Sequence, residues 1–299
     1  MLQTGLKQMN YIKFPNNFAE LEDDVSNYET SKVVILPIPY EKTTTYIKGT
    51  SKGPQAILEA SRNMELYDEE LDKDISKVGI CTLNELKIEE KPEQMVNVVD
   101  QNIKKLINDK KFPVIIGGEH SITLGCVKAF ASVYDNLSVL QLDAHTDLRE
   151  EYDGTKFSHA CAMKRSKEFT KNIVPVGIRS LCDEEADFIK KNNIKIFWAK
   201  DIFNNDNWID EAISKLSKNV YITFDLDVLD PSIMPSVGTP EPGGLYYYQL
   251  LKLLKKVFEE RNVVGFDVVE LCPNENNKSP DFTATKIIYK MIGYKFDKK

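Results

Sequence analysis

The stretch Ser138-Val-Leu-Gln-Leu-Asp-Ala-His-Thr-Asp147 joins a mostly aliphatic run to two acids and a histidine. Its first five residues predict a short buried strand. Asp143, His145 and Asp147 then follow at alternate positions. In extended backbone, alternate side chains project to the same face. The stretch therefore predicts a strand that delivers three potential metal ligands at its carboxyl end.

Three further apolar runs end in polar residues in the same way, at 113–117, 220–227 and 263–271. The potential ligands that close these runs, or follow them directly, are His120, Asp225, Asp227 and Glu270. In open α/β sheets, ligands bind at the carboxyl ends of the strands. Four strands that present acids or histidines at that end are expected to converge on one site.

Strand-like and helical patterns alternate along the chain. The strand-like runs are 33–38, 78–81, 113–117, 138–143, 174–178, 195–198, 220–227 and 263–271. Apolar residues recur at helical spacing in 55–67, 93–108, 122–132, 184–192, 208–217, 247–260 and 284–292. This alternation predicts an α/β fold, a three-layer α-β-α sandwich with a mostly parallel sheet of about eight strands. Because no linker divides the chain, residues 31–299 are expected to form a single domain after an N-terminal extension at 1–30.

Composition excludes several classes of protein. The 299 residues are 42% hydrophobic and 28% charged, which is typical of a globular protein, and the net charge of −7 disfavours nucleic-acid binding. No apolar run is long enough for a signal peptide or a membrane span. The five cysteines are odd in number and contain no Cys-x-x-Cys pair, so a disulfide framework is not expected. These features predict a cytoplasmic protein without membrane or nucleic-acid partners.

All three histidines of the chain, His120, His145 and His159, lie in such polar runs. Solvated turns explain most isolated Asp-x-Asp or Asp-x-His runs. Four aspartates at strand ends, however, are very costly to bury without cations. Two imidazoles and four carboxylates without a thiolate suit Mn²⁺ better than structural zinc, and they balance two divalent ions. Two metals about 3.5–4 Å apart can generate hydroxide at neutral pH.

Three motifs, Gly117-Gly-Glu-His-Ser121, Asp143-Ala-His-Thr-Asp147 and the run from Asp225 to Gly244, resemble the signatures of the ureohydrolases, the arginase–agmatinase family. Pro39-Tyr-Glu41 and Lys48-Gly-Thr50 resemble an N-terminal loop of agmatinases. The resemblance runs from about Val33 to the C-terminus. It implies an arginase-like fold, two Mn²⁺ ions per chain and a homo-oligomer, a trimer or hexamer.

The resemblance also assigns roles to single residues. One manganese would be held by His120, Asp143, Asp147 and Asp225. The other would be held by Asp143, His145, Asp225 and Asp227, so that Asp143 and Asp225 bridge. Asp147, His159 and Glu270 would be catalytic, and His159, Glu270 and Thr239 would bind the substrate. Glu119 is next to a ligand and is not expected to be one.

The implied reaction is hydrolysis of a small cationic guanidine by a metal-bridging hydroxide, with agmatine giving putrescine and urea in polyamine biosynthesis. Arginine and 4-guanidinobutyrate are the alternatives. Arg149 could receive a carboxylate at the tail of the substrate, whereas Glu150, Glu151 and Asp153 could attract an amine. Two other classes stay open: a non-catalytic regulator with the same fold, and a single-zinc deacetylase of a related fold.

Overall fold

A computed structural model, which describes residues 10–88, 91–203 and 205–297, contains a nine-stranded sheet. Its strands are β1 (Tyr11–Ile12), β2 (Val33–Ile38), β5 (Ile80–Leu83), β6 (Phe112–Gly117), β7 (Leu137–Leu142), β8 (Asn172–Ile178), β9 (Phe197–Trp198), β10 (Asn219–Asp225) and β11 (Asn262–Val269). The order across the sheet is β1-β5-β2-β6-β11-β10-β7-β8-β9. All neighbours pair in parallel except β1, which runs antiparallel to β5. A separate two-stranded ribbon joins β3 (Tyr67–Asp68) to β4 (Lys73–Asp74).

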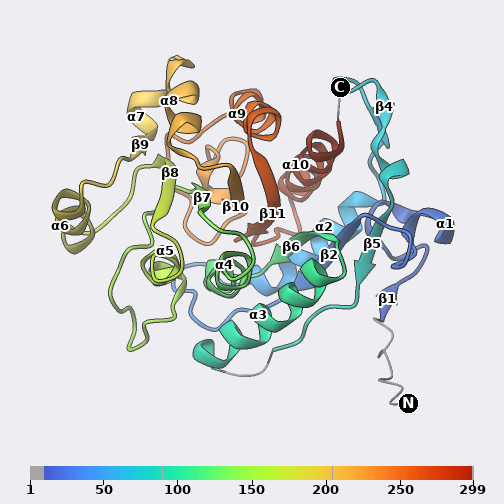
Figure 1. Cartoon of the computed structure of the whole chain (residues 1–299), viewed down its shortest axis with the longest axis horizontal. Coiled ribbons are helices and arrows are strands. Elements are labelled where there is room, and N and C mark those ends of the chain that lie inside the picture. The colour runs from blue at the N-terminus through green and yellow to red at the C-terminus, as the bar shows by residue number, and fades with distance from the viewer. Residues whose placement is uncertain (1–9, 89–90, 204, 298–299) are drawn as a thin grey trace.

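Helices cover both faces of the sheet (Figure 1). One face packs against α3 (Pro92–Asn108) and α4 (Thr123–Ala131), and α5 (Ala162–Ser166) packs beside α4 in the same layer. The other packs against α2 (Gly53–Ser61), α8 (Asn207–Lys215), α9 (Tyr247–Glu260) and α10 (Ser279–Phe296). The remaining helices are α1 (Asp23–Ser26), α6 (Asp183–Asn192) and α7 (Ala199–Ile202). The three-layer α/β architecture is therefore confirmed.

The continuous apolar runs of the strands follow from burial on both faces. Along β2, Val33 and Ile35 face the layer that contains α10, whereas Val34 and Leu36 face the layer that contains α3. All four side chains are almost completely buried. Each parallel strand thus contributes alternate side chains to two separate hydrophobic layers.

All eight predicted strands and all seven predicted helices form, and most of them have shifted ends. Most of the shortest elements were not predicted, because two to five residues show no periodicity: these are β1, β3, β4, α1, α5 and α7. Residues 10–30 contain β1, a 3-10 turn at Phe18–Glu20 and α1, and Phe18 and Leu21 lie in the core. Residues 1–9 of the expected N-terminal extension lie outside the described part.

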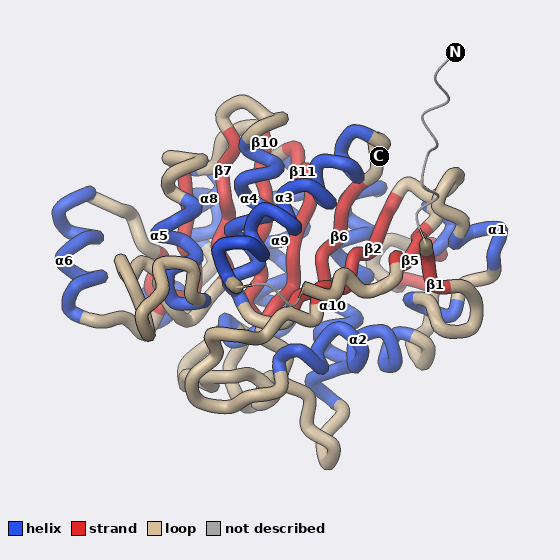
Figure 2. The backbone as a smooth tube through the Cα atoms, turned by 90° about the horizontal axis from the view of Figure 1, so that it is seen from below, coloured by secondary structure: helices blue, strands red, loops and turns tan. Residues whose placement is uncertain are grey.

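Long loops gather at one end of the parallel strands (Figure 2). The central strands β6, β11, β10 and β7 are direct neighbours, so the residues that follow them meet at this end. Of the helices within the described ranges, none combines the length and apolar character that a bilayer crossing requires. The sheet thus places the four polar runs of the sequence side by side.

Candidate metal centre

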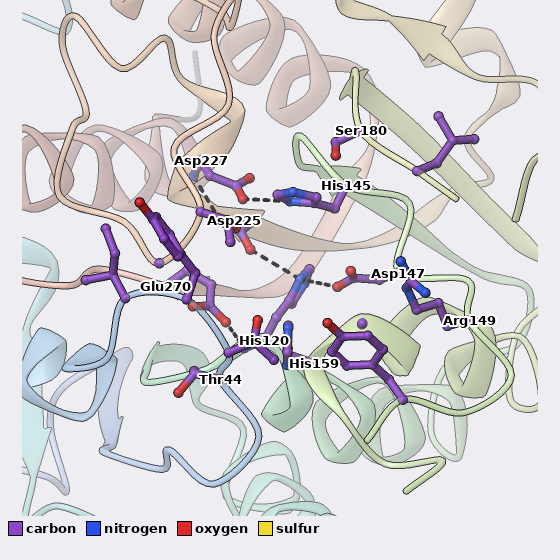
Figure 3. A pocket seen from close by; sticks show the side chains of 18 of the residues that line it. Thr44, His120, His145, Asp147, Arg149, His159, Ser180, Asp225, Asp227 and Glu270 are labelled. Atoms are coloured by element: carbon purple, nitrogen blue, oxygen red, sulfur yellow. Dashed lines mark hydrogen bonds and ion pairs between the residues drawn. The ribbon is translucent and has the colours of Figure 1, made fainter. Parts of the chain in front are cut away.

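The candidate ligands come from the ends of adjacent central strands (Figure 3). His120 opens a 3-10 turn after β6, and Asp143 directly follows β7. Asp225 is the last residue of β10, and Asp227 lies in the 3-10 turn Leu226–Val228 that follows. Glu270 directly follows β11. The strand order, rather than closeness in sequence, brings these side chains together.

His120 is surrounded by three carboxylates. Its Nδ1 atom lies 2.9 Å from Asp147 Oδ2, 3.3 Å from Asp143 Oδ2 and 3.4 Å from Asp225 Oδ2. The residue is buried, and none of the residues that the structure describes forms a hydrogen bond with Nδ1. A buried nitrogen that faces three carboxylate oxygens without a hydrogen bond is a suitable ligand position for a cation.

A second group lies next to the first. His145 Nδ1 is 2.9 Å from Asp227 Oδ2 and 3.8 Å from Asp143 Oδ1. Ligand atoms of Asp143, His145 and Asp227 all lie within 4.8 Å of one another, as do those of His120, Asp143 and Asp147. Asp143 belongs to both groups and is therefore placed to bridge two ions.

The local backbone between Asp143 and Asp147 differs from the prediction. These residues leave the strand after Leu142, and Asp147 has a positive φ of 52°. Asp143 Oδ1 accepts a hydrogen bond from the His145 N–H, and Gln141 Nε2 donates to Asp143 Oδ2. The expected extended backbone therefore holds only in part: Ala144 bends and Asp147 has a positive φ, whereas His145 still pairs with Ser180 in an isolated parallel bridge.

Further buried polar residues, which the motifs did not indicate, hold the ligands in place. His120 Nε2 lies 2.9 Å from Thr223 Oγ1, and Thr223 donates a hydrogen bond to Asp267. Thr223 and Asp267 interrupt otherwise apolar strands, which is the sequence signal that could have indicated them. Such outer partners orient metal-binding histidines.

Arg179, at the end of β8, plays a comparable part beside Asp227. Its guanidinium donates hydrogen bonds to the carbonyl oxygens of Asp227, Leu229 and Glu241 at 2.6, 3.3 and 2.7 Å. It therefore ties the turn that contains Asp227 to the loop after Thr239. No motif in the sequence points to this role.

The electrostatics of the centre favour bound cations. Burial, together with the negative charges of Asp227 and Asp143, raises the pKa of Asp225 well above its usual range. Burial and the Asp143 charge raise the pKa of Asp147 to about 7. Burial opposes ionisation of Asp227, but His145 outweighs it and lowers the pKa of Asp227 to about 2. Ionisation of all four buried aspartates is thus opposed until cations are bound, and the oxygen-rich donor set without cysteine fits two hard divalent ions.

A cavity of about 240 Å³ opens over the ligands. Besides the ligands, its wall includes Thr44, Tyr46, Arg149, Tyr152, His159, Thr239 and Glu270. His159 lies outside both ligand groups, and burial, together with the charges of His120 and His145, lowers the pKa of His159 to about 4. Burial and the charge of Glu119 raise the pKa of Glu270 to about 8. The structure thus brings every sequence-predicted site residue, apart from the fully buried Asp143, to the wall of one cavity.

Of the four residues considered for the substrate tail, only Arg149 lines the cavity. Its guanidinium stacks over the ring of Tyr152, 4.8 Å from the centroid, and its Nε lies 4.0 Å from Glu185. The Glu150 carboxylate instead pairs with Lys164 and Arg165. Neither Glu151 nor Asp153 is part of the cavity wall.

Comparison with known proteins gives a consistent result. The model of the Arginase family matches residues 31–293. An N(1)-aminopropylagmatine ureohydrolase of Synechocystis sp. is 42% identical over 94% of both chains. An agmatinase of Pyrococcus horikoshii is 33% identical over 92% of this chain and 95% of its own.

A solved structure supports the same relationship. The agmatine ureohydrolase of Thermoplasma volcanium superposes with a TM-score of 0.84 at 32% identity, covering 91% of this chain and 92% of that one. Sequence motifs, fold and site geometry agree, and the chain belongs to the arginase family.

Proposed function

We propose that the chain is a dinuclear manganese ureohydrolase that cleaves the guanidinium group of agmatine to give putrescine and urea. The observation that carries the proposal is Asp143, which is shared by two ligand groups at the base of a cavity that also exposes Glu270. Membership of the arginase family supports hydrolysis of a carbon–nitrogen bond in a linear amidine.

The ligand set supports the two ions. His120, Asp143, Asp147 and Asp225 would hold one, and Asp143, His145, Asp225 and Asp227 would hold the other. When bound, the pair of ions lowers the pKa of water and supplies the nucleophile at neutral pH. The four aspartates balance the charge of two divalent cations, which removes the repulsion among them.

The remaining side chains bind the substrate and move protons. The Glu270 carboxylate can accept charge-assisted hydrogen bonds from a guanidinium and so hold its carbon over the ligands. Asp147 accepts a proton from the nucleophile and passes it to the leaving amine. His159 and Thr239 line the cavity beside this position and contact the substrate.

The side chains at the outer part of the cavity favour a substrate with a cationic tail. Tyr46, which is 74% exposed, and Tyr152 line it, and aromatic faces attract ammonium groups. Arg149 supplies positive charge there, but the carboxylate of Glu185 lies next to it and offsets part of that charge. N1-aminopropylagmatine is the second candidate, because the Synechocystis relative carries that name and an exposed tyrosine at the mouth can accompany a longer tail.

The test is urea release by manganese-loaded protein with agmatine, N1-aminopropylagmatine, arginine and 4-guanidinobutyrate at equal concentrations. We expect the highest kcat/KM for one of the two polyamine-type guanidines. A preference for arginine or 4-guanidinobutyrate would overturn the substrate assignment. No urea from any guanidine would favour a regulator, and a single bound zinc would favour a deacetylase.

A further inference from the structure

Glu119, which was not expected to be a metal ligand, is the centre of a hydrogen-bond network beside the cavity. It is fully buried. Its Oε2 accepts hydrogen bonds from the backbone N–H groups of Lys42 and Thr43 at 2.6 and 2.7 Å. Its Oε1 accepts from the hydroxyls of Thr43 and Ser121 at 2.7 and 2.5 Å. Four donors converge on this carboxylate, so it acts as an acceptor on both oxygens.

The loop that Glu119 binds is also fixed from its other end. Glu41 accepts hydrogen bonds from the backbone N–H groups of Gly49 and Ser51, and from the hydroxyl of Ser51. The loop packs against the turn before His120 so closely that a Cβ on Gly118 would lie 2.1 Å from the Tyr40 carbonyl oxygen. The segment from Glu41 to Ser51 is therefore a preorganised wall of the cavity.

Thr43 connects this wall to His159. The Thr43 hydroxyl donates its single proton to Glu119, so its oxygen can only accept from other groups. It accepts one hydrogen bond from the backbone N–H of His159 at 3.0 Å. Nδ1 of the His159 ring lies 3.2 Å from the same oxygen. If Nδ1 carried a lone pair, it would face a lone pair of Thr43, so this contact favours a proton on Nδ1.

Ser158 does not reverse this conclusion. Its hydroxyl also lies 3.2 Å from His159 Nδ1, and it can act as donor or acceptor by rotating its proton. Thr43 lacks that freedom, because Glu119 takes its proton. The Thr43 hydroxyl therefore determines which nitrogen of His159 carries the proton, and the Ser158 hydroxyl rotates to match it.

We propose that Glu119 and Thr43 are positioning residues that hold His159 as the Nδ1–H tautomer and leave Nε2 as a free proton acceptor at the cavity. The proposal rests on the proposed function only in giving His159 a part in the reaction. With its proton on Nδ1, the neutral ring receives a proton through Nε2 and does not donate one from that atom. The carboxylate next to a metal ligand thus acts on His159 through the Thr43 hydroxyl.

A direct test uses nitrogen-15 NMR of histidine-labelled protein loaded with zinc, which is diamagnetic. The chain has only three histidines, so substitution of His159 identifies its signals. We expect Nδ1 of His159 to be protonated at neutral pH in the unaltered protein. A proton on Nε2 would overturn the proposal, whether or not the protein releases urea.

For the Glu119→Gln variant we expect the opposite tautomer of His159. The glutamine oxygen must accept from the backbone N–H groups of Lys42 and Thr43, so its amide group faces the Thr43 hydroxyl. Thr43 then accepts from that amide and donates to His159 Nδ1. The tautomer is expected to switch to Nε2–H in this variant, and an unchanged Nδ1–H tautomer would show that Glu119 does not control it.

Kinetic measurements on variants provide a third test. Thr43→Val should lower kcat about tenfold or more, with KM little changed, and Thr43→Ser should restore it because the hydroxyl returns. In a His159→Asn background, Thr43→Val should have no further effect, because it acts through the ring. Thr30→Val, at an exposed threonine in another loop, is the matched control. Additive losses from Thr43→Val and His159→Asn would contradict the positioning role, whereas inactivity of the unaltered protein with Nδ1–H intact would contradict only the proposed function.

Discussion

The Oε1 atom of Glu270 accepts a hydrogen bond from the backbone N–H of His120 at 2.6 Å. The backbone N–H of Glu270 in turn donates to the carbonyl oxygen of Gly118 at 2.8 Å, and Glu270 itself has a positive φ of 67°. The carboxylate proposed to bind the guanidinium is therefore fixed to the same turn that presents a metal ligand. The positions of Glu270 and of the ligand His120 are thus coupled through this turn.

Glu270→Gln should lower kcat/KM about 10²- to 10³-fold, because the charged acceptor for the guanidinium is lost. The glutamine oxygen can still accept from the His120 N–H, so both ions should remain bound. Steady-state kinetics and metal analysis of the same preparation measure the two effects. Loss of an ion, or an unchanged kcat/KM, would show that Glu270 has another role.

Replacement of a ligand that both groups share should remove more bound metal than replacement of a ligand that belongs to one group. Asp143→Asn removes a carboxylate common to both groups, whereas His120→Asn removes a ligand of one group. Asp225→Asn is expected to resemble Asp143→Asn if Asp225 also bridges. We expect both ions to be lost in the first variant and one in the second, measured by metal content after dialysis. Equal and mild losses would contradict a bridging Asp143.

The metal-free protein should become less stable as the pH rises. In the folded state the pKa of Asp147 is raised from 3.8 to about 7, and that of Glu270 from 4.5 to about 8, in each case mainly by burial. A raised pKa in the folded state favours folding below the unfolded value, and this contribution is lost as the pH rises through the folded value. The window is therefore between about pH 4 and pH 8, and His159, whose pKa is lowered from 6.5 to about 4, opposes the trend only in the lower part of it.

Bound manganese should reverse this trend, because the ions replace the protons and stabilise the ionised carboxylates. Thermal melting at several pH values, with and without Mn²⁺, measures the difference. We expect the gap between the two midpoints to widen towards pH 8. Coincident midpoints at every pH would mean that the carboxylates do not share bound cations.

Arg179→Met should weaken metal binding without removing a ligand. The variant loses the hydrogen bonds that fix the turn containing Asp227. Loss of such an outer contact typically lowers metal affinity about 10- to 100-fold. Competition with a chelator measures the affinity, and Arg62→Met, at an arginine with a peripheral contact to Asn16, is the control. An unchanged affinity would show that the turn keeps its shape without Arg179.

The sequence predicted the layers of the fold, the central strands and the candidate ligands, because a parallel sheet requires continuous apolar runs and places their polar ends together. It did not predict the bend at Ala144 or the positive φ of Asp147, since a positive φ at an aspartate leaves no mark in an alternating pattern. Nor could it predict that Glu119 would contact Thr43 and, through it, His159. These contacts join residues far apart in the chain, and only the packed structure brings them together.

The most direct test of the two-metal account is a titration of metal-free protein with Mn²⁺ while urea release from agmatine and N1-aminopropylagmatine is followed. The account predicts that activity rises until two ions are bound per chain and that a chelator abolishes it. Full activity with one bound ion per chain, or activity that survives complete removal of metal, would contradict it.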